Sequence, residues 1–350
     1  MLTISYRNRR GVQIENQHLR VTVLEGGGHI AELQHKPTGV NPLWTPPWPS
    51  IEPSAYDPGL HLHYGNDSES KLLAGIMGHN LCLDTFGGPS AEEAAAGITV
   101  HGEAPVVRHR IAELGGGLIV SADLPEAQLA FERRIRLDGP FVRISETVRN
   151  LSKLDHPAAW TEHVTLGPPF LEKGSTQFRL PATRSKVFEA PFGNADYMRP
   201  GAEFDWPLVP RVDGGTSDLR TFTAARVSGG FTTHLMDPSR ESAFFFAWSP
   251  KTKVLVGYIW KRSDFPWVGI WEENQSRTTP PWNGETVTRG IEFGASPMPE
   301  SRRQMIGRGK LFGESGYRWL PARTAMTVEY SAFVTTAEAI PETEEELNVV

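Results

Sequence analysis

Two titratable side chains, far apart in the sequence, are suited to move protons near neutral pH. His163 lies shortly before a Gly-Pro-Pro-Phe stretch, and an imidazole, with its ordinary pKa of about 6.5, can act as an acid or as a base. Glu292 lies between Ile291 and Phe293 in an expected strand, so its side chain faces away from these two apolar ones. For each residue taken alone, a structural role as a core histidine or a solvent-exposed glutamate is the commoner outcome.

Aromatic residues provide a second chemical signal. The chain has 10 tryptophans, and an aromatic ring can stack on the apolar C–H face of a pyranose while polar neighbours hold its hydroxyls. For any single tryptophan, an anchor in the core is the commoner role. Four tryptophans crowd into one stretch before Glu292: Trp260, Trp267, Trp271 and Trp282.

Short strands joined by turns must position these residues. The 34 glycines and 28 prolines punctuate short apolar or alternating segments, which is typical of a mostly β protein. Helical patterns occur only at residues 91–96 and in the acidic segment 341–347. We expect strands at residues 19–24, 29–34, 117–122, 130–137, 142–149, 243–249, 254–260, 287–293 and 326–334.

Residues 41–65 depart from this rhythm. They contain Trp44, Trp48, six prolines and the tripeptide His61-Leu62-His63. A loop of this length in a compact domain usually serves a site. A flap that covers a sheet edge is an equally good interpretation.

Composition and charge exclude several classes of protein. The net charge is −6, and the sequence has no run of Lys and Arg that could neutralise a line of phosphates, so we expect no nucleic-acid partner. No stretch of about 18 apolar residues predicts a membrane span. Cys82 is the only cysteine, which excludes an intrachain disulfide and fits the reducing cytoplasm. We expect one domain over residues 10–335 and an acidic tail at 336–350.

Several segments, in order along the chain, resemble the galactose-mutarotase-like superfamily of aldose 1-epimerases and their relatives. His163 falls where the family has its catalytic histidine, shortly after an Asn-x-Ser element, and Glu292 falls in the family's late Glu-containing strand. The matching segments are Leu-Glu-Gly-Gly-Gly-His-Ile-Ala-Glu-Leu at 24–33 with Thr-Gly at 38–39, His-Gly-Glu at 101–103, Arg-Ile-Arg-Leu-Asp-Gly-Pro-Phe-Val-Arg-Ile at 134–144 and Val-Arg-Asn-Leu-Ser at 148–152.

The resemblance implies a large antiparallel β-sandwich with few short helices, and an enzyme that interconverts sugar anomers. Glu292 would be the base and His163 the acid of ring opening, and the reaction would need a small sugar but no metal or redox cofactor. The family's early Gly-rich segment usually presents an arginine with an Asn, whereas residues 75–80 offer His79 and Asn80. The residues implied for substrate binding are His101, His79, Asn80, Glu162 and Trp271.

Three alternatives stay open at this point. A lyase or glycosidase on the same fold would need a second carboxylate facing Glu292, for which the candidates are Glu162, Glu272 and Glu273. A cupin-type metalloprotein would use His61 and His63 with Glu69. A carbohydrate-binding protein without catalytic activity would keep only the cleft.

Overall fold

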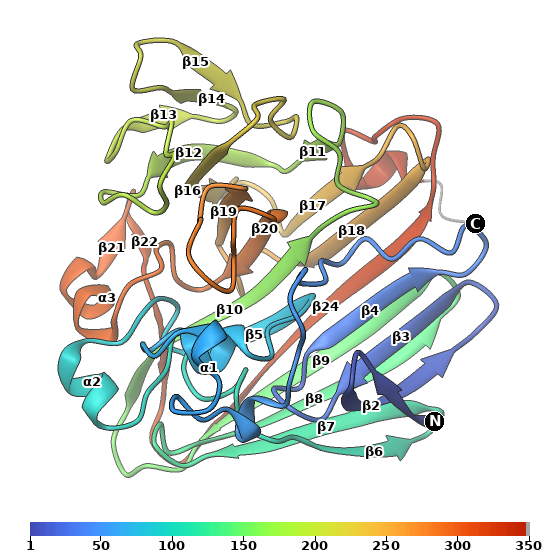
Figure 1. Cartoon of the computed structure of the whole chain (residues 1–350), viewed down its shortest axis with the longest axis vertical. Helices are drawn as coiled ribbons and strands as arrows, with labels where there is room; N and C mark the ends of the chain where they lie inside the picture. Colours follow the sequence, from blue (N-terminus) through green and yellow to red (C-terminus); the bar gives the residue numbers. More distant parts are fainter. Residues whose placement is uncertain (348–350) are drawn as a thin grey trace.

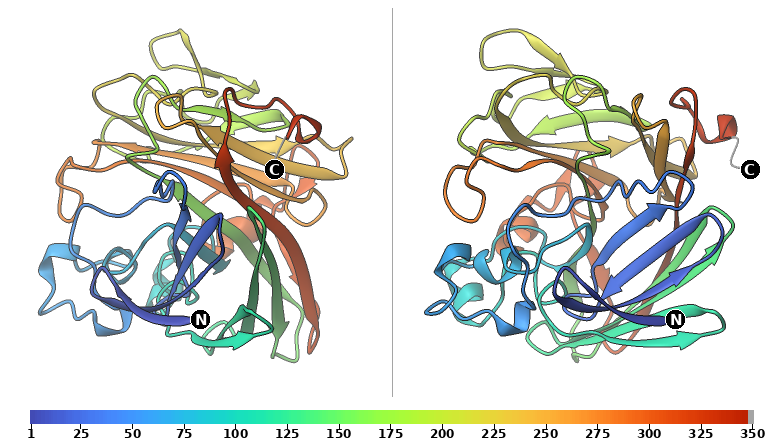
Figure 2. Two further views of the ribbon diagram at one scale, coloured as in Figure 1. Left: turned by 90° about the vertical axis from the view of Figure 1, so that its right-hand side faces the viewer. Right: turned by 45° about the vertical axis from the view of Figure 1, so that its right-hand side comes forward.

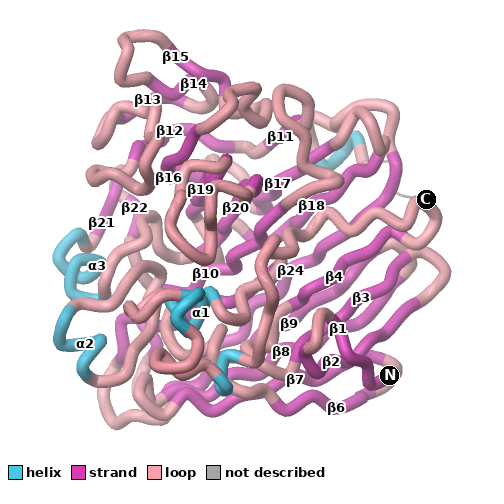
Figure 3. The backbone as a smooth tube through the Cα atoms, in the orientation of Figure 1, coloured by secondary structure: helices cyan, strands magenta, loops and turns pink. Residues whose placement is uncertain are grey.

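Strands are the main regular element of the structure, a computed structural model that describes residues 1–347 (Figure 3). Each strand expected from the sequence is present, and the two main sheets are antiparallel. The chain is therefore mostly β, as predicted. Figure 1 shows the order of the elements, and Figure 2 shows the two curved sheets from two further directions.

The first sheet has twelve strands, and its two edge strands are β1 and β13. Its central strands come from distant parts of the sequence, and β23 pairs with the beginning of β10. In spatial order the strands are β1 (Leu2–Tyr6), β2 (Arg9–Glu15), β3 (Leu19–Leu24), β4 (Ile30–His35), β5 (His79–Asp84), β10 (His156–Leu166), β20 (Val287–Gly294), β19 (Trp267–Asn274), β16 (Ser228–Met236), β12 (Ala182–Val187) and β13 (Glu203–Asp205), with β23 (Arg318–Leu320) beside β10.

The second sheet has eight strands. In spatial order they are β11 (Gln177–Arg179), β17 (Ser242–Trp248), β18 (Val254–Lys261), β24 (Ala325–Thr336), β9 (Phe141–Asn150), β8 (Leu129–Asp138), β7 (Gly117–Leu124) and β6 (Arg110–Leu114). Two short hairpins complete the strands: β14 (Leu208–Pro210) with β15 (Thr216–Asp218), and β21 (Lys310–Leu311) with β22 (Glu314–Ser315).

Helices are few and short. The helix expected at residues 91–96 is α2 (Ala91–Ala95), which begins at Ser90 with a capping box to Glu93. Among residues 1–347, no helix has the length and apolar character needed to span a bilayer. The others are α1 (Ser70–Leu73), α3 (Arg302–Arg308) and the 3-10 helices η1 (Pro53–Ala55), η2 (Leu62–Tyr64) and η3 (Glu344–Glu346).

The main core lies between the two sheets and follows from the period of two along each strand. In β20, Ile291 and Phe293 are fully buried in this core, and Phe131 of β8 and Val142 of β9 belong to it from the other sheet. Glu292 must then face the outer side of the first sheet, as the sequence predicted.

A second apolar cluster covers the outer face of the first sheet. Trp267 and Trp271 rise from β19, and Trp44 and Trp48 reach them from the segment 41–65, which is largely irregular as expected and includes η1 and η2. Trp282 stacks on Trp44, with ring centroids 6.3 Å apart. This cluster, which we call the tryptophan cap, shields the centre of the first sheet from water.

The ends of the chain extend the expected domain on both sides. Strand β1 pairs with β2 before residue 10. Beyond β24, Ile340 packs against an apolar cluster with Phe244 and Phe246, and Glu344 accepts a hydrogen bond from Arg240. Residues 337–347 of the expected tail therefore contact β17, and residues 348–350 lie outside the described part.

Candidate active site

His163 and Glu292 meet on the outer face of the first sheet. They stand directly opposite each other on the neighbouring strands β10 and β20, so their side chains share one face. His163 Nε2 lies 3.1 Å from Glu292 Oε1, and the side chains are only 6% and 3% exposed. Two titratable residues far apart in the sequence thus form one buried pair.

Glycines make room for the Glu292 carboxyl group. A Cβ atom at Gly290, on the same strand, would overlap Glu292 Oε1, and one at Gly269, across the strand pair on β19, would overlap the ring of Phe231. The absence of a side chain at Gly290 therefore leaves room for the Glu292 carboxyl group, and its absence at Gly269 leaves room for the Phe231 ring.

A pocket lies between this pair and the tryptophan cap. It encloses about 50 Å³ and is lined by residues of the sheet and of the loops and turns that cover it. Four of the residues proposed from the sequence line it: His101, His163, Trp271 and Glu292. The other lining residues are Glu69, Leu72, Leu73, Ile76, Phe86, Phe192, Arg277, Trp282 and Pro299.

Burial shifts the titration of the two central groups in opposite directions. It lowers the pKa of His163 to about 3 and raises the pKa of Glu292 well above its ordinary value. Both directions favour the uncharged pair, with the proton on Glu292. Moving that proton to His163 gives an ion pair with the same number of protons, so the pair can exchange one proton without taking up another.

Several buried polar atoms around the pair have no hydrogen-bond partner within residues 1–347. They are Glu292 Oε1, which is close to His163 but not aligned with it, Trp271 Nε1, and both side-chain polar atoms of Asn80. Asn80 stands opposite His163 on β5, next to the pocket rather than in its lining. Because buried polar groups are rarely left unpaired, these atoms are suited to bind the polar groups of a ligand.

His101 reaches the pocket from a tight turn, as the His-Gly motif suggested. His101 and Gly102 both have positive φ angles, 69° and 79°, a region that is uncommon for a residue with a side chain. His101 Nδ1 lies 2.8 Å from Cys82 Sγ, and the His101 and His163 ring centroids are 4.8 Å apart. If the thiol donates to Nδ1, then His101 Nε2 carries a proton.

His79 and Glu162 do not line the pocket, which corrects their expected role in substrate binding. Each is adjacent in sequence to a residue on the pocket face, Asn80 and His163, so strand alternation turns it to the opposite face. Both side chains are fully buried between the sheets, and His79 Nε2 lies 2.7 Å from Glu162 Oε2. A sugar in the pocket therefore does not contact them.

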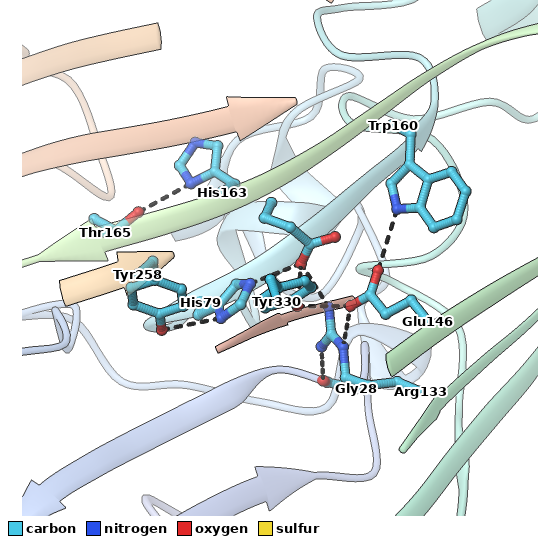
Figure 4. Close-up of polar contacts among 10 residues, drawn as sticks. Gly28, His79, Arg133, Glu146, Trp160, His163, Thr165, Tyr258 and Tyr330 are labelled. Atoms are coloured by element: carbon cyan, nitrogen blue, oxygen red, sulfur yellow. Dashed lines mark hydrogen bonds and ion pairs between the residues drawn. The ribbon is translucent and has the colours of Figure 1, made fainter. Parts of the chain in front are cut away.

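Glu162 instead pairs with a buried guanidinium between the two sheets. Arg133 of β8 donates to Glu146 at 2.5 Å and to Glu162 at 2.8 Å, and Tyr330 of β24 donates to both carboxylates. Figure 4 shows this network on one side of β10 and His163 on the other. The network joins the sheets and lies behind the active-site face.

The candidates for a second catalytic carboxylate have other partners. Glu272 accepts hydrogen bonds from Arg289 at 2.8 Å and Ser228 at 2.6 Å, and Glu273 accepts from the backbone and hydroxyl of Ser276. Glu162 lies in the interior network. None of these three candidates lines the pocket, and the second carboxylate in its lining is Glu69.

His61 precedes η2 and His63 lies within it, in the segment 41–65. Their ring centroids are 6.5 Å apart, and His61 Nδ1 accepts a hydrogen bond from the backbone of Asp57. Among residues 1–347, no three His, Cys, Asp or Glu side chains gather in a way suited to a metal ion. Glu69 instead lines the pocket.

A larger concavity, of about 1390 Å³, lies along the second sheet. Its lining is rich in exposed cations such as Arg134, Arg136 and Lys261, and contains neither His163 nor Glu292. The smaller pocket is the better candidate for a functional site, because it holds the buried pair His163 and Glu292 and lies beside unpartnered polar atoms.

Replacing His163 by Asn is expected to change how stability depends on pH. The folded protein keeps His163 neutral down to a pKa of about 3, whereas the unfolded chain takes up the proton near pH 6.5, so acid favours unfolding of the wild type. Between pH 7 and pH 5 the stability of His163→Asn relative to wild type should rise by about 2 kcal/mol. Urea denaturation at both pH values measures this difference. A pH-independent difference would mean that folded His163 takes up its proton as readily as the unfolded chain does.

Three further pocket residues with polar side-chain atoms were not predicted from the sequence to line the site. Trp282 was noted only as a member of the tryptophan-rich stretch, Glu69 only as a metal ligand, and Arg277 not at all. Arg277 lies in the loop between β19 and β20, where no periodic pattern shows which way a side chain points.

The whole chain has close structural counterparts. No family model matches it, and no curated protein does. One counterpart, from Klebsiella pneumoniae, is described as a "putative aldose 1-epimerase"; it has a TM-score of 0.64 and 12% identity over 95% of this chain and 80% of its own. A galactose mutarotase-like protein from Clostridium acetobutylicum has a TM-score of 0.62 and 13% identity over 96% and 98%. A galactose mutarotase related enzyme from Lactobacillus acidophilus has a TM-score of 0.58 and 11% identity over 93% and 97%.

These counterparts share the architecture at low sequence identity, and the matches cover more than nine-tenths of this chain. The expected large antiparallel sandwich is confirmed by the two packed sheets. The protein therefore has the galactose-mutarotase-like fold.

Proposed function

We propose that this protein is an aldose 1-epimerase-like isomerase that interconverts the anomers of a small sugar. The contact between His163 Nε2 and Glu292 Oε1, 3.1 Å apart at the floor of a buried pocket, is the observation that carries the proposal. Trp271 supports it, because its ring lies beside His163 with centroids 5.8 Å apart and offers a face on which a pyranose can stack.

The reaction conserves the single proton of the pair. Glu292 takes the proton of the anomeric hydroxyl, the C1–O1 double bond forms as the C1–O5 bond breaks, and His163 donates a proton to O5. This step begins with the ion pair and ends with the uncharged pair, so the proton of Glu292 must first pass to His163. After rotation about C1–C2, O5 attacks the other face of C1, O5 returns its proton to His163, and Glu292 returns its proton to O1.

Proton NMR of freshly dissolved α-glucose, α-galactose and a panel of sugar phosphates tests the proposal. We expect the purified protein to accelerate anomer exchange of at least one sugar, and His163→Asn to lower that rate by about 10²- to 10⁴-fold. His234→Asn is the matched control, because burial also lowers the pKa of His234 to about 3 and it lies outside the pocket lining.

Two outcomes would contradict the proposal. One is the uncatalysed rate with every sugar in the panel. The other is an exchange rate that survives in His163→Asn while that variant remains folded. Sugar binding without exchange would instead identify a carbohydrate-binding protein that lacks catalytic activity.

A further inference from the structure

The mouth of the pocket holds an ion pair that the proposed chemistry does not use. Arg277 Nη1 lies 3.2 Å from Glu69 Oε1, and the two side chains are 20% and 34% exposed. His163 and Glu292, at the other end of the pocket, are 6% and 3% exposed. The pocket therefore has a reactive floor and a charged, more accessible mouth.

We propose that Arg277 and Glu69 form the specificity end of the site and bind adjacent hydroxyl groups of the sugar away from its anomeric carbon. This inference rests on the proposed function only for the orientation of the sugar. With the anomeric carbon at the His163–Glu292 floor, the opposite edge of a pyranose points to the mouth.

A guanidinium beside a carboxylate is chemically complementary to a vicinal diol. The guanidinium has only N–H donors and the carboxylate only acceptors, whereas each hydroxyl both accepts and donates. Two neighbouring hydroxyls can thus accept from Arg277 and donate to Glu69, and hydrogen bonds to charged groups are the stronger kind.

The aromatic neighbours hold Arg277 in a position that a sugar can share. Its guanidinium carbon lies 4.7 Å from the ring centroid of Trp282 and 5.8 Å from those of Trp271 and Phe192. These rings supply the apolar face for stacking, and Arg277 supplies donors beside it. Aromatic faces next to a few polar groups are typical of small-molecule pockets.

The ion pair must also part for a sugar to enter. The pocket encloses about 50 Å³, whereas ligand pockets commonly measure about 300–1,000 Å³. His163, Trp271 and Glu292 belong to central strands of the sheet, while Arg277 and Glu69 extend from covering segments. The sugar hydroxyls would then replace part of the contact between the two side chains.

Kinetics of Arg277→Ala with the accepted sugar tests the inference. We expect KM to rise about 10- to 100-fold, because hydrogen bonds to a charged group are lost, while kcat changes less than about threefold, because the acid/base pair is intact. Glu69→Ala should show the same selective rise in KM. Arg240→Ala is the matched control, since Arg240 is 28% exposed, pairs with Glu344 at 2.9 Å and lies 5.7 Å from the ring of Phe244.

Monodeoxy analogues of the sugar show which hydroxyls are involved. The analogue that lacks the hydroxyl bound by Arg277 should bind wild type weakly, and its KM should rise no further in Arg277→Ala. A lower KM in Arg277→Ala would mean that Arg277 only blocks the mouth, and an unchanged KM would mean that it does not contact the sugar. Either result overturns the inference.

Tryptophan fluorescence separates this inference from the proposed function. Trp271 and Trp282 line the pocket, so sugar binding can be followed without turnover. Suppose that the wild type binds a sugar without exchanging its anomers and that Arg277→Ala weakens this binding. This result would support the binding of sugar hydroxyls by Arg277 and reject the isomerase. Anomer exchange with the same KM in Arg277→Ala as in the wild type would support the isomerase and reject the binding of sugar hydroxyls by Arg277.

Discussion

Glu292→Gln is expected to slow anomer interconversion by about 10²- to 10⁴-fold, the usual contribution of a positioned acid or base. The amide has nearly the shape of the carboxyl group but cannot take up the proton of the anomeric hydroxyl. Because burial raises the pKa of Glu292, the neutral amide resembles the form that the fold favours, so we expect little loss of stability. NMR exchange rates together with urea denaturation measure the two effects separately.

Glu103→Gln is the matched control for this variant. Burial also raises the pKa of Glu103, and its carboxyl group accepts a hydrogen bond from the backbone of Ala127 at 2.8 Å, which an amide oxygen can still accept. Glu103 lies outside the pocket lining, so its variant should keep the wild-type rate. Equal rates for Glu292→Gln and Glu103→Gln would remove Glu292 from the mechanism.

Arg133→Met is expected to lower the free energy of unfolding by about 3–5 kcal/mol at pH 7, because it leaves buried carboxylates without their cation. Burial raises the pKa of Glu146 to about 7 even with Arg133 nearby. Burial opposes the charge of Arg133, but Glu146 reverses that effect and raises the guanidinium pKa. Urea denaturation of the variant and the wild type measures the loss.

The neighbouring residue provides the control for Arg133. Arg134 is on the same strand but on its exposed face, with 60% side-chain exposure and a surface ion pair to Glu132, so Arg134→Met should change stability by less than about 0.5 kcal/mol. The loss in Arg133→Met should also shrink from pH 7 to pH 5. Arg133 lowers the pKa of Glu146 in the wild type, so folded Glu146 takes up a proton more readily in the variant than in the wild type, and acid stabilises the folded variant more. Equal stabilities of the two variants would contradict the role of Arg133.

Most strands of the second sheet could be predicted from the sequence, but β5, β10, β19 and β16 at the centre of the first sheet could not. In β9 the burial alternates with a period of two, because one face meets the core and the other meets water. In β10 nearly every residue is buried, since the sandwich core covers one face and the tryptophan cap covers the other. Polar residues occur on both faces of β10, so no alternation of polarity marked it as a strand.

The misplaced site residues have the same origin. His163 lines the pocket, but its neighbour Glu162 was expected there too, and His79 was expected beside Asn80. Consecutive residues of a strand point to opposite faces, so once β5 and β10 are known to be strands, only one of each pair can face the pocket. The alternation that orients Glu292 correctly could have separated these pairs as well.

By itself, the sequence determined the strand-rich architecture, the outward orientation of Glu292 and a histidine suited to proton transfer, because period-two alternation and side-chain chemistry are local properties. Only the tertiary structure decided which residues meet. The pairing of β10 with β20 brings His163 to Glu292, and the covering loops bring Glu69 and Arg277 over them. Such contacts depend on strand order and loop path across more than a hundred residues, and no local pattern encodes them.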